Sequence, residues 1–196
     1  MRKIKIIQHY SLDGVVQAPG GPEEDPSGGF DHGGWALRRP DPAIGEAIAG
    51  AHGDRFDLLL GRRTYDIWSD YWPGQSGPMA DQLNSATKFV ATHRPETLHW
   101  GPAQDLGPDV YAGVRAMKAT AGPDVVLWGS STLTSRLLAD ALADELLLLI
   151  RPVLLGSGKR LFAAAPPCDL SLIDAKPTGA GALICRFAVA GAPSGL

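Results

Sequence analysis

The sequence predicts an α/β protein with a mainly parallel central sheet, helices on both faces, and an antiparallel C-terminal edge. Segments of strand length alternate with segments of helical periodicity up to residue 150, a pattern typical of β-α-β units. Two strand-like segments near 169–175 and 182–189 then follow each other around a Lys-Pro-Thr-Gly turn, which predicts an antiparallel hairpin. We expect residues 1–196 to form a single domain, because this length suits one domain.

The strands are predicted mostly from short runs of isoleucine, valine and leucine. They are expected at residues 4–10, 56–60, 87–92, 97–100, 124–128 and 145–151. The last of these segments is apolar on both faces, as expected for a strand in the middle of a covered sheet. Helices are predicted where apolar residues recur every three or four positions, at about 42–51, after 61–65, and at 110–121 and 133–142.

The helix expected at 42–51 has a clear start, because Asp41 is a good N-cap residue and Pro42 suits the first helical position. The preceding residues, 11–42, are rich in glycine, proline and aspartate. A connection of this length inside a domain is usually functional or disordered. Because we expect few of its residues to enter a core, part of the segment is expected to be mobile when no ligand is bound.

Composition excludes several classes of protein. The net charge is −3, with 18 basic and 21 acidic residues, so a nucleic-acid-binding protein is not expected. The longest apolar run, residues 146–150, is far shorter than the ~20 residues that cross a membrane, and no secretion signal is visible. The two cysteines and five histidines show no metal-ligand spacing, so no metal site is expected. We therefore expect a cytoplasmic protein.

Three turns at predicted strand ends have residues that suit a phosphate-containing ligand. The turn at 61–64 combines a glycine, two arginines and a threonine at a helix start. The turn at 92–94 places a hydroxyl beside a guanidinium, and the turn at 129–131 offers small residues before a helix. The ordinary alternatives are solvated arginines, a polar loop and a serine N-cap. Because ligands of open α/β sheets bind at the carboxyl ends of strands, the joint occurrence of the turns favours a ligand site.

Several longer motifs occur together along the chain. They are Ser11-Leu12-Asp13-Gly14, Gly33-Gly34-Trp35, Gly61-Arg62-Arg63-Thr64-Tyr65, Trp128-Gly129-Ser130-Ser131 and Arg151-Pro152-Val153-Leu154-Leu155-Gly156-Ser157-Gly158-Lys159-Arg160-Leu161-Phe162. In this combination the chain resembles the dihydrofolate reductase superfamily, in particular the branch of the C-terminal reductase domain of bifunctional riboflavin biosynthesis proteins. The resemblance covers nearly the whole chain. It implies a dihydrofolate-reductase-like three-layer sandwich and a homodimer.

The resemblance also implies an NADPH site at the three turns. The residues implied for it are Gly61, Arg62, Arg63, Thr64, Thr92, His93, Arg94, Gly129, Ser130, Ser131 and Leu133. Arg62 and Thr64 are implied to hold phosphates, the 92–94 turn to surround the adenosine 2′-phosphate, and the 129–131 turn to line the pyrophosphate and nicotinamide. We expect NADPH to be preferred over NADH, because clustered guanidinium groups suit the additional phosphate.

Reduction of a C=N or C=O bond needs a proton as well as a hydride. Asp41 and Asp13 are the candidate catalytic acids. Asp41 begins the helix on which the family carries its acid, whereas the ordinary role of Asp41 is a helix cap and that of Asp13 is to cap the following turn. Leu12 and Trp35 are expected to contact the substrate, which is held beneath the 14–40 segment.

These expectations combine into an NADPH-dependent reductase of a small heterocyclic substrate, a pterin or a pyrimidine as in riboflavin biosynthesis. Hydride transfer from the nicotinamide is the implied reaction. The alternative is an NADPH-binding regulatory protein that has kept the cofactor site without turnover. Neither hypothesis involves nucleic acid or a membrane.

Overall fold

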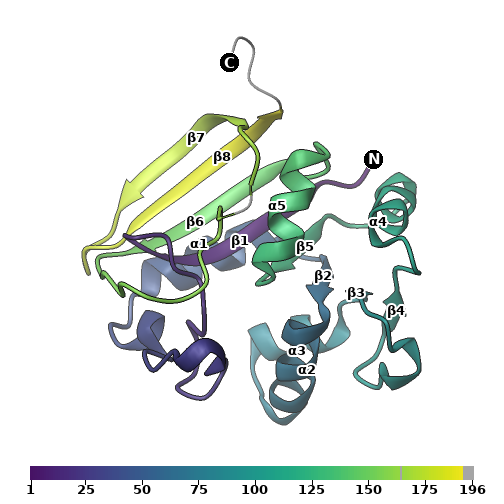
Figure 1. The fold of residues 1–196 in the computed structure, drawn as a ribbon, viewed down its shortest axis with the longest axis horizontal. Helices are drawn as coiled ribbons and strands as arrows, with labels where there is room; N and C mark the ends of the chain where they lie inside the picture. Colours follow the sequence, from purple (N-terminus) through teal and green to yellow (C-terminus); the bar gives the residue numbers. More distant parts are fainter. Residues whose placement is uncertain (164, 192–196) are drawn as a thin grey trace.

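Eight strands form one sheet in the order β4-β3-β2-β5-β1-β6-β8-β7 in the computed structural model, which describes residues 1–163 and 165–191 (Figure 1). The strands are β1 (Ile4–Ser11), β2 (Asp57–Gly61), β3 (Lys88–Ala91), β4 (Ala103–Asp105), β5 (Val125–Trp128), β6 (Glu145–Arg151), β7 (Asp169–Pro177) and β8 (Leu183–Gly191). The strands β4, β3, β2, β5, β1 and β6 all run parallel to one another. Strand β8 pairs antiparallel with β6 and with β7. The predicted α/β class, with its antiparallel C-terminal hairpin, is confirmed.

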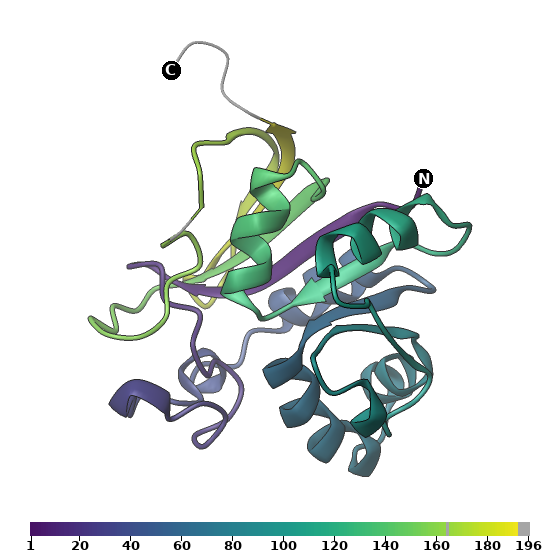
Figure 2. The same cartoon turned by 45° about the vertical axis from the view of Figure 1, so that its right-hand side comes forward.

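Helices cover both faces of this sheet. They are α1 (Pro42–His52), α2 (Arg62–Tyr71), α3 (Pro78–Ser85), α4 (Val110–Ala119) and α5 (Ser131–Ala139), with short 3₁₀ turns at Ser27–Gly29, Trp35–Leu37, Trp72–Gly74 and Pro95–Thr97. Side chains of α4 and α5 pack against one face, and side chains of α1, α2 and α3 pack against the other. Figure 2 shows the teal α4 and the green α5 together on one side of the sheet. Every helix within the described residues is too short or too polar to span a bilayer.

Strand β6 shows how alternating side chains build the two cores. Leu146 and Leu148 join the apolar cluster beneath α4 and α5. Leu147 and Leu149 join the cluster on the α1 side of the sheet. Successive side chains of a strand point to opposite faces, so a strand buried on both sides must be apolar at every position. The prediction for residues 145–151 is confirmed.

The start of α1 also agrees with its prediction. The Asp41 Oδ1 atom accepts a hydrogen bond from the Ala43 backbone N–H at 3.2 Å, and Pro42 is the first helical residue. This carboxylate satisfies one of the N–H groups that a helix start leaves free. The N-cap role of Asp41 therefore uses one oxygen of its carboxylate.

The strand predicted at 97–100 is wrong. A 3₁₀ turn occupies Pro95–Thr97, and the strand β4 comes later in the chain. Trp100 is buried as a single anchoring side chain, and its backbone N–H donates to the Tyr65 hydroxyl at 2.7 Å. The sequence pattern also does not reveal α3, because this helix buries only Ala80 and Leu83 and is too short to show a period.

The long segment between β1 and α1 has a small core of its own. Its buried cluster consists of Val15, Ala18, Phe30, Trp35 and Ala36. The indole N–H of Trp35 donates to the Gln17 carbonyl at 2.8 Å, which fixes this large side chain within the segment. Two aromatic rings supply apolar area that holds this part of the segment together. The mobility expected for part of the segment stays a prediction.

Candidate functional site

The three predicted turns lie at the same edge of the sheet. Strands β3, β2 and β5 are parallel neighbours, so their carboxyl ends lie side by side. The 92–94 turn follows β3, the 61–64 turn leads from β2 into α2, and the 129–131 turn leads from β5 into α5. Because α2 and α5 pack on opposite faces, their N-termini approach the edge from both sides. Helix N-termini favour anions, so the arrangement suits a negatively charged ligand.

Two of these turns touch each other through their glycines. A Cβ atom built on Gly61 would lie 2.6 Å from the Ser130 hydroxyl oxygen. A Cβ atom built on Gly129 would lie 2.7 Å from the Thr64 hydroxyl oxygen, and the φ angle of Gly129 is +66°. Both positions therefore require glycine, one for space and one for space and backbone conformation. The reciprocal contact joins the start of α2 to the start of α5.

Ser130 has a left-handed backbone, with φ 54° and ψ 71°. This conformation is uncommon for a residue with a side chain and costs about 1–3 kcal/mol. Ser130 occupies the N-cap position predicted as the ordinary alternative, but its side chain makes no capping bond. Within the described residues, the start of α2 likewise has no side-chain cap. The first N–H groups of both helices are therefore available to an acceptor at this edge.

Arg62 links the first turn to the second. Its Nη1 atom donates to the Thr92 hydroxyl at 3.2 Å and to the Arg94 carbonyl at 3.0 Å. The Thr92 hydroxyl also accepts from the Arg94 backbone N–H at 3.0 Å. The Nε atom of Arg62 is buried and has no hydrogen-bond partner in the described part of the chain. Arg62 thus shapes the turn after β3 and keeps one donor unused.

Asp66 is a residue of this site that the motif analysis missed. Its carboxylate accepts from Arg62 at 2.7 Å and lies 3.3 Å from the Arg94 guanidinium. The spacing of Arg62 and Asp66 by four residues on a helix was visible in the sequence. The approach of Arg94, which comes from another strand end, was not. His93 is exposed beside this group.

Arg63 points to the long segment. Its guanidinium forms an ion pair with Asp25 at 2.7 Å, and the same carboxylate pairs with Lys159 at 2.6 Å. Burial raises the pKa of Asp25, but hydrogen bonds from Lys159 and Ser27 outweigh this effect and hold the pKa below its usual value. Asp25 therefore stays ionised and ties the long segment both to α2 and to the loop that follows β6.

The remaining residues implied for the cofactor have simpler surroundings. Ser131 is the first residue of α5, and its carbonyl accepts from the Ser135 hydroxyl at 3.1 Å. Leu133 is a core residue, 6% exposed, and a Cβ atom on Gly61 would lie 3.8 Å from it. Leu133 thus supports the glycine contact from the core side.

The two candidate acids have different surroundings. The Asp13 carboxylate accepts from the Ser11 hydroxyl at 2.7 Å and from the N–H groups of Leu155 and Gly156 at 3.1 and 2.9 Å. Burial acts to raise the pKa of Asp13, but these hydrogen bonds lower it to about 2. Asp13 is therefore an ionised turn-capping group. In Asp41, by contrast, the Oδ2 atom is buried without a partner among the described residues.

The two residues expected to contact the substrate differ in their exposure to solvent. Leu12 is 64% exposed directly after β1. Trp35 is 4% exposed within the core of the long segment, where its indole is already hydrogen-bonded. Leu12 is thus open to a ligand, whereas Trp35 shapes the segment.

Two polar residues of the central strand β1 extend the site beyond the three turns. The Gln8 side chain donates to the Gly129 carbonyl at 2.9 Å. The His9 ring lies 6.0 Å from the Trp128 ring, and burial, followed by the charge of Arg151, lowers the pKa of His9 to about 4. Sequence reasoning missed these residues. The available signal was their polarity at the carboxyl ends of strands that are otherwise apolar.

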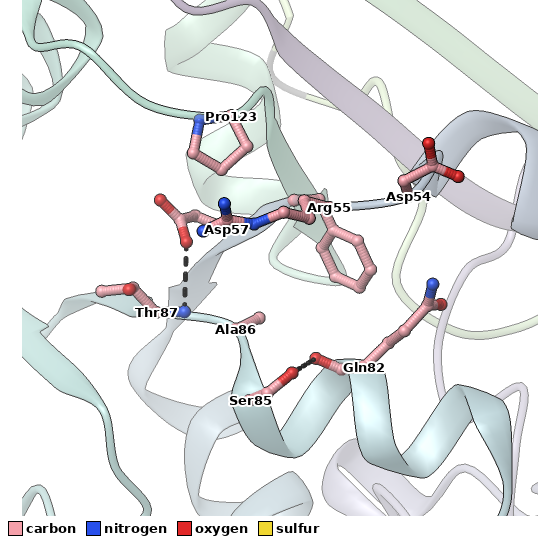
Figure 3. A pocket seen from close by; sticks show the side chains of 9 residues that line it. Asp54, Arg55, Asp57, Gln82, Ser85, Ala86, Thr87 and Pro123 are labelled. Carbon is pink, nitrogen blue, oxygen red and sulfur yellow. Dashed lines mark hydrogen bonds between the residues drawn. The ribbon is translucent and has the colours of Figure 1, made fainter.

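Two pockets of the described surface lie away from the edge of the sheet that carries the three turns. The one in Figure 3 has a volume of about 210 Å³ and lies at the amino ends of β2, β3 and β5, next to Asp57, Thr87 and Pro123. The other, of about 550 Å³, lies in the long segment beside Gly33 and Leu37. Neither contains a residue of the three turns. In residues 1–163 and 165–191 no three side chains of histidine, cysteine, aspartate or glutamate are grouped for a metal ion.

Comparisons with known proteins identify several relatives. The chain is 26% identical over 167 residues to the uncharacterized protein YyaP of Bacillus subtilis (strain 168), and the match covers 82% of this chain and 80% of that protein. A putative riboflavin biosynthesis protein from Shewanella sp. PV-4 has the same fold, with a TM-score of 0.69, 18% identity, and coverage of 95% of this chain and 98% of that one.

Two further solved structures show the same fold. A pyrimidine reductase-like protein from Corynebacterium diphtheriae aligns with a TM-score of 0.62 and 13% identity, over 96% of this chain and 92% of that one. Acinetobacter baumannii RibD aligns with a TM-score of 0.62 and 15% identity, over 96% of this chain but 58% of that one. The RibD C-terminal domain family itself matches residues 2–184, which is nearly the whole sequence. The chain therefore belongs to the RibD C-terminal domain family.

Proposed function

We propose that the chain is an NADPH-dependent reductase of a small heterocyclic substrate, a pterin or a pyrimidine. The observation that carries this proposal is the reciprocal contact in which Gly61 meets Ser130 and Gly129 meets Thr64. It brings two helix starts together at the carboxyl edge of the sheet, where the backbone can approach a pyrophosphate closely. The match to a family named after RibD, and a neighbour named pyrimidine reductase-like, support the class of reaction.

The basic residues of the turns support the choice of NADPH. Arg62 and Thr64 are proposed to hold phosphates at the start of α2, and Arg94 with Thr92 is proposed to hold the 2′-phosphate. The buried Nε of Arg62, which has no partner in the described residues, fits a donor kept for a ligand. When bound, NADPH supplies a hydride to the substrate. The residues of the chain supply position and charge.

Asp41 is the proposed proton donor. One of its oxygens caps α1, and the other is buried with no hydrogen-bond partner among the described residues. Before the reaction that second oxygen is an acceptor for a substrate N–H, and during it the carboxylate passes on a proton that it takes from water. Asp13 is not proposed for this step, because three hydrogen bonds and a pKa of about 2 keep its carboxylate ionised.

We further propose that residues 1–196 act as one domain within a homodimer. A single sheet includes strands from Ile4 to Gly191, which supports one domain. Strand β7 lies at the end of the sheet (Figure 1). Its exposed apolar side chains are Leu170, Leu172 and Ile173. Exposed apolar side chains on an edge strand are typical of an interface, and a second copy is the proposed partner.

Titration with NADPH and NADH, followed by tryptophan fluorescence, tests the proposed cofactor. NADPH is expected to bind more tightly, and Arg94→Met should weaken NADPH binding about 10- to 150-fold by removing a charge-assisted contact. NADH binding should change much less. Arg136→Met is the matched control, because Arg136 is also an exposed arginine paired with an aspartate, but on the far part of α5. Equal affinities for the two cofactors would contradict the proposal.

Turnover is tested separately, by the loss of NADPH absorbance in the presence of pterins and pyrimidines. Oxidation that depends on one of these substrates is expected for a reductase. Tight NADPH binding with no oxidation would instead support the alternative of an NADPH-binding regulatory protein.

A further inference from the structure

Three buried polar atoms without partners in the described residues lie near the carboxyl ends of β1 and β6 and the start of α1. They are His9 Nδ1, Asp41 Oδ2 and Arg151 Nε. Buried polar groups in proteins almost always have hydrogen-bond partners, because an unpaired one loses its water without compensation. Three such atoms in one region therefore indicate a place where another molecule completes the hydrogen bonds.

The side chains of His9 and Arg151 face the same side of the sheet. Strands β1 and β6 are parallel neighbours, with His9 opposite Leu149 and Ser11 opposite Arg151. Leu149 belongs to the apolar cluster on the α1 side, and Arg151 follows it by two residues, so both side chains point to that side. His9 points there too, since its ring approaches Trp128, which belongs to the same cluster.

Electrostatic effects connect the three groups. The charge of Arg151 contributes to lowering the pKa of His9 after the larger effect of burial. Burial also lowers the pKa of Arg151, and the charge of Asp41 opposes this shift. Arg151 thus acts on His9 and is acted on by Asp41, which places all three groups in one electrostatic environment.

Asp41 and Arg151 nevertheless do not form an ion pair in the part of the chain that the structure describes. The Nη1 atom of Arg151 instead donates to the backbone carbonyl of Arg39 at 3.3 Å. This distance is at the long end for such a bond, so the interaction is weak. The acceptor is an uncharged amide oxygen contributed by the long segment. One edge of the guanidinium is therefore held loosely, and the Nε atom has no partner among residues 1–163 and 165–191.

We propose that Arg151, His9 and Asp41 form a recognition site for a cyclic amide edge of the substrate, a ring carbonyl beside a ring N–H. The carbonyl takes the place of the Arg39 oxygen on Arg151, and the N–H donates to Asp41 Oδ2. His9, which is uncharged near neutral pH, completes the hydrogen bonds, and Trp128 forms an aromatic wall beside it. This inference rests on the proposed function for the place of the substrate in the fold. It assigns Arg151 as the residue that distinguishes an oxo group from an amino group.

The test compares two probes with the same ring system. Lumazine carries two ring carbonyls beside ring N–H groups, whereas 2,4-diaminopteridine carries amino groups in their place. Isothermal titration is expected to show lumazine binding at least about tenfold more tightly, the usual effect of a hydrogen bond to a charged donor. Arg151→Met should remove this preference. Arg186→Met is the control, because Arg186 is exposed on β8.

Two additional measurements keep the test independent of any loss of folding. Asp41→Asn retains a good N-cap residue, so α1 should form, while lumazine binding should weaken because the amide can present an N–H donor where the carboxylate presents only acceptors. In Arg151→Met, the pKa of His9, followed by NMR of the imidazole, should rise because a neighbouring positive charge is gone. An unchanged His9 pKa would show that the groups are not neighbours and would overturn the proposed site.

The outcomes separate this inference from the proposed cofactor. If NADPH fails to bind but lumazine is preferred and Arg151→Met abolishes that preference, the recognition site stands and the proposed reductase function fails. If NADPH binds but 2,4-diaminopteridine binds as well as lumazine, or better, Arg151 does not select an oxo group. Failure of the wild-type chain to bind either pteridine would likewise overturn the inference.

Discussion

Asp66 competes for the arginines that the proposed cofactor site uses. Its carboxylate contacts Arg62 at 2.7 Å and Arg94 at 3.3 Å, and the Arg94 side chain is 59% exposed. An exposed ion pair such as that of Arg94 and Asp66 contributes about 0–1 kcal/mol, so Asp66→Asn is expected to tighten NADPH binding by a few-fold, about five at most. NADH should respond less, because it lacks the 2′-phosphate. Titration calorimetry with both cofactors measures the difference.

Asp70→Asn is the matched control for Asp66. Asp70 is an exposed acid on the same helix, four residues later. An equal gain in both variants would indicate a general effect of charge and would contradict a specific role of Asp66.

The two candidate acids predict opposite phenotypes. Asp41→Asn should keep the helix cap and lower turnover about 10²- to 10⁴-fold, the usual contribution of a positioned acid. Asp13→Asn should mainly lower thermal stability, because the Asp13 carboxylate holds the N–H groups of Leu155 and Gly156. Initial rates and melting temperatures, both followed against pH, distinguish the two. Full turnover in Asp41→Asn would show that Asp41 is only a cap.

Lys88 predicts a change of stability at alkaline pH. Its side chain is fully buried. The Nζ atom donates to the Asn84 carbonyl at 2.7 Å and lies 4.2 Å from the centre of the Trp100 ring. Burial lowers the pKa of Lys88 from 10.5 to about 8. Between these two pKa values the unfolded chain binds more protons than the folded chain. The free energy of unfolding should therefore rise with pH across that window, by at most about 1.4 kcal/mol per pH unit.

Urea denaturation of the wild type and of Lys88→Met at several pH values in that window measures the effect. The difference between the two free energies of unfolding isolates Lys88 from the tyrosines and other lysines. Lys176→Met is the control, because the Lys176 side chain is 72% exposed. Parallel pH dependences in the wild type and Lys88→Met would contradict the assigned pKa.

At the scale of elements, the ion pairs of Asp25 are expected to slow the local opening of the long segment between β1 and α1. It joins this segment to Arg63 of α2 and to Lys159 beyond β6. Asp25→Asn should speed amide exchange across residues 20–29, because it weakens both ionic contacts while leaving the apolar cluster in place. Hydrogen–deuterium exchange with mass spectrometry measures this change, and residues of α4 provide the internal reference. Strong and equal protection in both proteins would show that the apolar cluster alone holds the segment.

The elements that the sequence predicts well are those with a strong apolar period. Strand β6 is apolar at nearly every position, and α1 has both an N-cap and a proline at its first position. The segment at 97–100 is misassigned because the burial of Trp100 depends on Tyr65, a contact between distant parts of the chain. A local pattern carries no information about such a contact.

For the whole molecule, the exposed face of β7 predicts a dimer. Leu172 is 61% exposed on this strand. The wild type is expected to migrate as a dimer, and Leu172→Asp as a monomer, because an aspartate in an apolar interface loses its hydration. Size-exclusion chromatography with light scattering measures the mass. Leu154→Asp is the control, since Leu154 is also exposed but lies outside β7. A monomeric wild type would contradict the prediction.

The candidate site is only partly visible in the sequence, for a physical reason. The residues of the three turns are adjacent in the chain, so glycines and arginines at strand ends reveal them. Asp66 and Arg94, or His9 and Arg151, become neighbours only through the order of the strands. A polar residue at the end of one apolar strand has no visible partner until the register of the next strand is known.

The position of β1 also has a consequence for synthesis of the chain on the ribosome. Ile4 pairs with Val125 and Lys5 with Glu145. Both hydrogen-bonding partners of β1 are therefore synthesised more than a hundred residues after it. At roughly 5–20 residues per second, translation leaves this strand without partners for on the order of ten seconds. Nascent chains that end before β6 therefore present an unpaired strand edge, which can template aggregation until its partners are made.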